Sequence, residues 1–113
     1  MSSPITTHVL DTATGRPAAG LAITLDRRVG DDWKQIGAGV TDSDGRVRDL
    51  ITRDAFGAGD HRIRFETGKW FEDTGRQGFY PYVEVVFTVT APSSHHHVPL
   101  LLSPFGYSTY RGS

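Results

Sequence analysis

Short segments in which apolar and polar residues alternate, separated by turn-forming residues, recur along the whole chain. Because successive side chains of a β-strand point to opposite faces, a period of two predicts strands that are buried on one side. We expect strands at residues 5–10, 21–26, 33–40, 61–67, 83–90, 97–103 and 106–111, and a further one beginning at Arg46. About eight short strands with turn residues between them predict an all-β, antiparallel sandwich or barrel.

One segment departs from this alternation. Residues 68–78 (GKWFEDTGRQG) predict a short helix, which Trp70 and Phe71 anchor to the core and Gly75 ends. The predicted strand at residues 33–40 is the weakest of the set, because glycine in a strand interior leaves no side chain to pack.

The turn at residues 41–45 reads Thr-Asp-Ser-Asp-Gly. Its final residue, Gly45, can adopt a positive φ at no steric cost. Arg46 therefore begins a strand directly beside a loop.

The last nineteen residues, 95–113, carry unusually much apolar surface for a chain end. Ends of chains fray unless packing holds them, whereas this one contains a run of three leucines after Pro99, followed by Phe105, Tyr107 and Tyr110. We predict that the tail forms core strands and that its final residues belong to the working surface of the protein.

Composition narrows the class of protein. The 113 residues predict a single domain, 1–113, with one core. The formal charge is −1, and ten arginines and two lysines are scattered rather than clustered, which gives no electrostatic case for nucleic acid or an anionic membrane. There is no cysteine, no secretory signal pattern and no membrane-spanning stretch, so we expect a soluble, cytoplasmic protein.

Five histidines are the main candidates for chemistry: His8, His61, His95, His96 and His97. In an extended segment His95 and His97 point to one side and His96 to the other. A solvated polar loop is one interpretation. A metal site from His8, His95 and His97 is a second, although no carboxylate or thiolate stands at ligand spacing beside them.

A third interpretation is general acid–base catalysis without an organic cofactor. One imidazole could take a proton from water while an arginine stabilises a developing oxyanion, and Arg46 is the best-placed arginine. No Gly-Xaa-Ser-Xaa-Gly elbow surrounds any serine, and no GxGxxG, Walker, HExxH or EF-hand pattern is present. The usual signatures of serine hydrolases and of nucleotide or metal enzymes are therefore missing.

Three separate motifs resemble one known family. They are Thr-His-Val-Leu-Asp at 7–11 with Thr-Gly-Arg-Pro-Ala at 14–18, Thr-Asp-Ser-Asp-Gly-Arg at 41–46, and His-Val-Pro-Leu-Leu-Leu-Ser at 97–103 leading to the final Tyr-Arg-Gly-Ser at 110–113. In this order they resemble the 5-hydroxyisourate hydrolases, the transthyretin-related enzymes of urate breakdown. The resemblance extends over essentially the whole chain.

This resemblance implies a transthyretin-like sandwich of two four-stranded sheets with one short helix, assembled as a homotetramer with sites between dimers. It implies His8, Arg46 and His97 as catalytic residues. Tyr110, Arg111, Gly112 and Ser113 would contact the substrate, and no metal or cofactor would be needed.

The implied reaction is hydrolytic opening of the six-membered ring of 5-hydroxyisourate to 2-oxo-4-hydroxy-4-carboxy-5-ureidoimidazoline. The alternative is a non-catalytic carrier of the transthyretin type, which would hold a small aromatic ligand in the channel between dimers. A metal-binding or purely structural sandwich is a third possibility. Polar side chains at positions 8, 46 and 97 favour the enzyme, because they suit a polar ring better than an apolar ligand.

Overall fold

The alternating segments fold into nine strands within residues 3–112, the part of the chain that the computed structural model describes. The strands are β1 (Ile5–Asp11), β2 (Arg16–Pro17), β3 (Ala22–Val29), β4 (Asp32–Val40), β5 (Arg46–Val47), β6 (Gly59–Phe65), β7 (Val83–Val89), β8 (His96–Ser103) and β9 (Gly106–Thr109). One α-helix, α1 (Thr67–Asp73), and a 3₁₀ turn, η1 (Arg53–Ala55), complete the elements.

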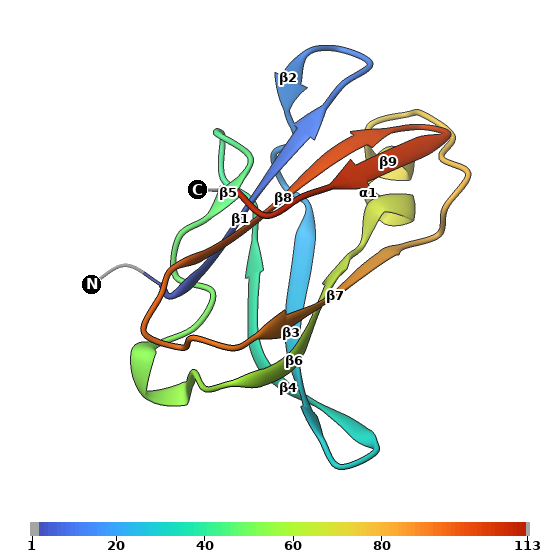
Figure 1. Ribbon diagram of the computed structural model, residues 1–113. Coiled ribbons are helices and arrows are strands. Elements are labelled where there is room, and N and C mark those ends of the chain that lie inside the picture. The colour runs from blue at the N-terminus through green and yellow to red at the C-terminus, as the bar shows by residue number, and fades with distance from the viewer. Residues whose placement is uncertain (1–2, 113) are drawn as a thin grey trace.

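The strands form two facing sheets. One has the order β2-β1-β8-β9, with β5 also paired to β1, and the other has the order β4-β3-β6-β7. Figure 1 shows the first strand (blue) running beside the last strands (orange and red), with the second sheet stacked against them. The predicted sandwich with one short helix is confirmed, and the C-terminal segment is part of a sheet as expected.

The core lies between the two sheets and is built from one side of each strand. In β1 the buried side chains are every second one, beginning at Ile5, and the intervening ones are partly exposed. The same period recurs in β6, where Ile63 and Phe65 are fully buried. Burying an aliphatic or aromatic side chain of this size contributes about 1.5–3 kcal/mol, so the sandwich is stabilised mainly by this shared layer.

One feature differs from the sequence-based expectation. The sheet around β1 holds five strands rather than four, because β2 and β5, of two residues each, both pair with β1. The helix ends where predicted, because Thr74 is its C-cap and Gly75, with φ 75°, follows directly. The predicted strand at 33–40 is present in spite of its glycines. A Cβ at Gly37 would lie 2.2 Å from the Leu50 carbonyl oxygen. Glycine is required there by close packing.

The first and last long strands, β1 and β8, are parallel neighbours. Their register pairs Ile5 with His96 and Thr6 with His97. This pairing brings together residues about ninety positions apart in the chain. No helix within residues 3–112 is long and apolar enough to cross a membrane.

Candidate active site

His8 and Arg46 are neighbours across two strands. The antiparallel pairing of β1 with β5 places His8 opposite Arg46. In β1 the side chains of Ile5, Thr7 and Val9 are buried, so the half-exposed His8 points out of the sandwich. Arg46 is half-buried on the same outer face. The sheet therefore presents an imidazole and a guanidinium side by side.

A tight turn fixes the backbone of Arg46. The Asp42 carboxylate accepts hydrogen bonds from the backbone N–H of Arg46 at 3.0 Å and of Asp44 at 2.9 Å. The bond from Arg46 is the main reason that the pKa of Asp42 is lowered. Gly45 has φ 76°, and a Cβ there would lie 2.5 Å from the Val9 carbonyl oxygen. The Asp-Ser-Asp-Gly-Arg sequence thus holds Arg46 against β1.

His97 completes the group from the other side of β1. Its Nδ1 lies 2.8 Å from the Thr6 Oγ1 across the β1–β8 pair. Burial lowers the pKa of His97, and the nearby positive charge of Arg46 and the ring of His8 lower it further. A lowered pKa keeps this imidazole neutral at neutral pH, which is the state that can accept a proton.

The C-terminal segment covers the His97 ring. Gly112 pairs with His97 in an isolated antiparallel bridge, and its N–H donates to the His97 carbonyl at 2.9 Å. A Cβ at Gly112 would lie 2.5 Å from Cδ2 of that ring. Only a glycine allows the tail to lie this close to the imidazole.

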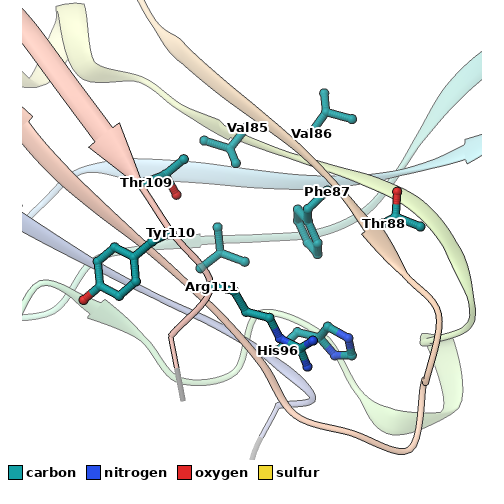
Figure 2. A pocket seen from close by; sticks show the side chains of 9 residues that line it. Val85, Val86, Phe87, Thr88, His96, Thr109, Tyr110 and Arg111 are labelled. Carbon is teal, nitrogen blue, oxygen red and sulfur yellow. The ribbon is translucent and has the colours of Figure 1, made fainter.

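The other tail residues divide between the two faces of the sheet. Thr109 pairs with Leu100 and Gly112 with His97, and this register puts Tyr110 on the outer face and Arg111 on the inner face. Figure 2 shows the Arg111 side chain running toward His96, whereas the ring of Tyr110, which also borders the cavity, points away from the other labelled side chains. Ser113, the fourth predicted substrate contact, lies outside the described residues.

A cavity of about 230 Å³ lies on the inner side, between β7 and the β8–β9 hairpin. Its lining includes Val85, Phe87, Val98 and Arg111. It is mostly apolar, and it lies on the face of β8 that carries His96 and Val98, opposite to the face that carries His97. The cavity and the cluster of His8, Arg46 and His97 are therefore two different places.

The three consecutive histidines alternate as predicted. His96 is buried, with its Nδ1 3.0 Å from the Ser94 carbonyl oxygen and its ring 5.7 Å from that of Phe56. The Nε2 of His95 lies 2.8 Å from the same Thr6 hydroxyl that contacts His97. His95 and His97 thus share the outer face, whereas His96 belongs to the interior.

The metal-site interpretation finds no support in the geometry. Among residues 3–112, no three His, Cys, Asp or Glu side chains gather closely enough to hold a metal ion. His95 and His97 instead direct ring nitrogens at a hydroxyl, Thr6 Oγ1. Within the described residues, hydrogen bonds to Thr6 organise this pair.

Sequence reasoning missed Thr6. It stands two residues before His8 and therefore faces the same side of β1. That parity was readable in the sequence, but the parallel pairing that brings His95 and His97 to it was not.

Residues 5–112 match the HIUase/Transthyretin family. The chain belongs to this family. It is 47% identical to the 5-hydroxyisourate hydrolase of Mus musculus, with 99% of this chain and 97% of the mouse protein covered. The family resemblance drawn from the three motifs is therefore confirmed.

Solved structures of the family share this fold. Sea bream transthyretin, solved in complex with thyroxine, superimposes with a TM-score of 0.92 at 36% identity, covering 97% of this chain and 95% of that one. The 5-hydroxyisourate hydrolase of Klebsiella pneumoniae superimposes with a TM-score of 0.84 at 34% identity, covering all of both chains. The transthyretin-like sandwich is confirmed. Both branches of the HIUase/Transthyretin family share it, so side chains must distinguish them.

The outer-face cluster provides the groups that hydrolysis needs. It offers a neutral imidazole with a lowered pKa, His97, a second imidazole, His8, and a fixed cation, Arg46. An imidazole can accept or deliver protons, and a guanidinium can bind an oxyanion or a planar polar ring. All three are partly exposed on the outer face of the β1–β8 sheet.

Proposed function

We propose that this protein is a 5-hydroxyisourate hydrolase that opens the six-membered ring of its substrate in urate degradation. The observation that carries the proposal is the convergence of His8, Arg46 and His97 on one face of the β1–β8 sheet. Relatives named 5-hydroxyisourate hydrolase, at 43–47% identity over nearly the whole chain, support the same activity.

The reaction begins with water. Neutral His97 accepts a proton from a water molecule whose oxygen attacks the ring carbonyl carbon. The carbonyl oxygen takes up negative charge, which the Arg46 guanidinium stabilises. The ring carbon–nitrogen bond then breaks, and the departing nitrogen takes a proton from the imidazolium. The products of the step are a carboxylic acid, which releases its proton to solvent at neutral pH, and a ureido group on the opened ring, and no redox partner is required.

His8 is the second proton carrier of the site. It lies opposite Arg46 and near His97, so it can orient the substrate or deliver the proton to the leaving nitrogen. A positioned base contributes about 10²- to 10⁴-fold, and an oxyanion donor about 3–4 kcal/mol. These contributions set the loss of reaction rate that we expect when each residue is removed.

The tail supplies further substrate contacts in this proposal. Tyr110 and Gly112 share the outer face with His97, and Ser113 follows directly in sequence. Arg111 was predicted alongside them, but its side chain lines the open cavity between β7 and the β8–β9 hairpin of the same protomer. We therefore assign substrate contact to Tyr110, Gly112 and Ser113, and assign Arg111 to the cavity.

A homotetramer would close the site. The cluster lies on an open sheet face that a second copy can cover. In addition, β7 and β9 are edge strands of their sheets on the same side of the sandwich, with exposed Val86 and Tyr107. Unpaired edges favour pairing with another copy. One contact through the edges and one through the outer face generate a tetramer of single-domain protomers.

The carrier alternative predicts binding without turnover. The two are separated by following the ultraviolet absorbance of freshly generated 5-hydroxyisourate with and without the protein. The proposal requires decay well above the spontaneous rate, with the imidazoline product formed in equal amount. Decay at the spontaneous rate would instead favour a carrier.

A further inference from the structure

The Thr6 hydroxyl is placed between two imidazoles. Its Oγ1 lies 2.8 Å from Nδ1 of His97 and 2.8 Å from Nε2 of His95. The neighbouring hydroxyl, Thr7 Oγ1, points inward and donates to the Val98 carbonyl at 2.6 Å. Thr6 is therefore the hydroxyl of this pair of threonines that faces the catalytic cluster.

A hydroxyl has one proton to donate, whereas it can accept more than one hydrogen bond. When both contacts of Thr6 are hydrogen bonds and both rings are neutral, two arrangements are available. In the first, His97 Nδ1–H donates to Thr6, and Thr6 donates to His95 Nε2. In the second, His95 Nε2–H donates to Thr6, and Thr6 donates to His97 Nδ1.

The two arrangements give His97 opposite chemistry. A neutral imidazole carries one N–H, so in the first arrangement the proton is on Nδ1 and Nε2 presents a lone pair. In the second, Nε2 carries the proton and cannot accept another from water. Within the described chain Nε2 of His97 makes no hydrogen bond to protein, so it is the nitrogen available to the reaction. Only the first arrangement makes His97 a base.

We propose that Thr6 and His95 are positioning residues that select the base tautomer of His97. This inference rests on the proposed hydrolase function. Neutral His95 accepts the Thr6 proton and thereby holds the proton of His97 on Nδ1. Protonated His95 has only N–H groups, so it donates to Thr6, and Thr6 turns its own proton to His97 Nδ1. The charge state of His95 thus decides whether Nε2 of His97 accepts or donates a proton.

The surroundings allow this switch. His95 is exposed and can exchange protons with water, whereas His97 is half-buried beneath Gly112. The titratable or charged groups that act on His97 are Arg46 from β5, His8 from β1 and His95, which precedes β8. Of these groups, only the imidazoles of His8 and His95 can exist in both a neutral and a protonated form.

The first test compares two substitutions at Thr6. Thr6→Val keeps the side-chain volume and removes the hydroxyl, and we expect kcat to fall at least about 10-fold with KM little changed. Thr6→Ser restores the hydroxyl, and we expect it to recover most of that loss. Thr88→Val is the matched control, because Thr88 also donates to a side chain, Asp60, but in the other sheet.

The second test reads the tautomer directly. Long-range ¹H–¹⁵N NMR of the wild-type imidazoles at neutral pH should place the His97 proton on Nδ1, and in Thr6→Val the Nε2–H form should gain population. This measurement needs no turnover. It stays informative if the protein proves inactive on 5-hydroxyisourate. Failure of the proposed tautomer selection and failure of the proposed function are therefore distinguishable.

The third test uses acid pH. His95→Gln supplies an acceptor that does not titrate. The slope of log kcat against pH on the acid side should therefore be smaller than in wild type by about one. Three results would each overturn the proposal that Thr6 and His95 select the tautomer of His97. They are wild-type kcat in Thr6→Val, an unchanged His97 tautomer in that variant, and an unchanged acid limb in His95→Gln. If Thr6→Val does not fold, the tautomer and acid limb of His95→Gln decide the question.

Discussion

Gly112 lies directly against the imidazole of His97, and this contact explains why the Tyr-Arg-Gly-Ser ending needs a glycine. Gly112→Ala would place a methyl group 2.5 Å from Cδ2 of the ring. Either the ring or the tail must move, and we expect kcat to fall at least about 10-fold, because small displacements of catalytic groups are costly.

The control for this prediction is Gly106→Ala in β9. A Cβ at Gly106 meets only the Ser103 hydroxyl, at 3.6 Å, which is an ordinary contact. Near-normal turnover is expected for Gly106→Ala. Equal activity of the two variants would contradict a role for the Gly112 contact.

The lowered pKa of His97 predicts a pH profile. Because the pKa of His97 is lowered, its own protonation should lie below the ordinary histidine value of 6.5, and turnover by the neutral imidazole should fall as that protonation proceeds. Burial is the main cause of the lowered pKa, and the positive charge of Arg46 is the second. Arg46→Gln should therefore move the acid limb to higher pH as well as lower kcat. A limb that stays in place would argue against electrostatic coupling between these residues.

At the scale of elements, the β1 strand is tied to the segment after α1 by an ion pair. The Asp11 carboxylate is nearly inaccessible and accepts a 2.7 Å hydrogen bond from Arg76, whose guanidinium also lies over the rings of Trp70 and Phe71. Burial alone would raise the pKa of Asp11, but bonds from Arg76 and Thr14 lower it overall.

Arg76→Ala should therefore destabilise the protein strongly. It leaves a buried carboxylate without its cation, at a cost of about 3 kcal/mol in the free energy of unfolding. Asp11→Asn should cost less, because it removes the charge together with the need for a partner. Denaturant unfolding at equal protein concentration measures both. A larger loss in Asp11→Asn would contradict this account of the pair.

Buried histidines predict acid sensitivity of the sandwich. Burial is the main cause that lowers the pKa of His61 and of His96, and His61 Nε2 is a buried nitrogen with no hydrogen-bond partner in the described chain. In the unfolded chain these histidines take up protons near pH 6.5, at a higher pH than in the folded chain. Their contribution to stability is therefore complete above that value and is lost as pH falls through the lower folded pKa values.

His61→Leu checks this element. In acid, the slope of the unfolding free energy against pH should decrease by the amount that corresponds to about one bound proton. This holds whatever the substitution does to stability at neutral pH. The matched comparison is wild type over the same pH range. An unchanged slope would show that His61 does not titrate on unfolding.

At the scale of the whole molecule, the sequence predicted the sandwich and the three catalytic candidates, but not how they meet. Alternation in β1 and β8 was enough to put His8 and His97 on exposed faces. The parallel β1–β8 register was not predictable from either strand, because strand pairing depends on the packing of the whole sheet. Thr6 was missed for this reason, and so was the inward direction of Arg111.

The assembly carries a prediction of its own. If a second copy closes the outer face, activity per protomer should fall when dilution dissociates the oligomer, and sedimentation should show the loss of the tetramer over the same concentration range. An isolated protomer that turns over substrate at the full rate would contradict a shared site.

The most direct test of the account is the rate of 5-hydroxyisourate disappearance measured with wild type and with His8→Ala, Arg46→Ala and His97→Ala. Each variant should retain the wild-type fold by circular dichroism and lose at least about 100-fold in kcat/KM. Near-normal turnover in all three variants would contradict the claim that these residues form the active site.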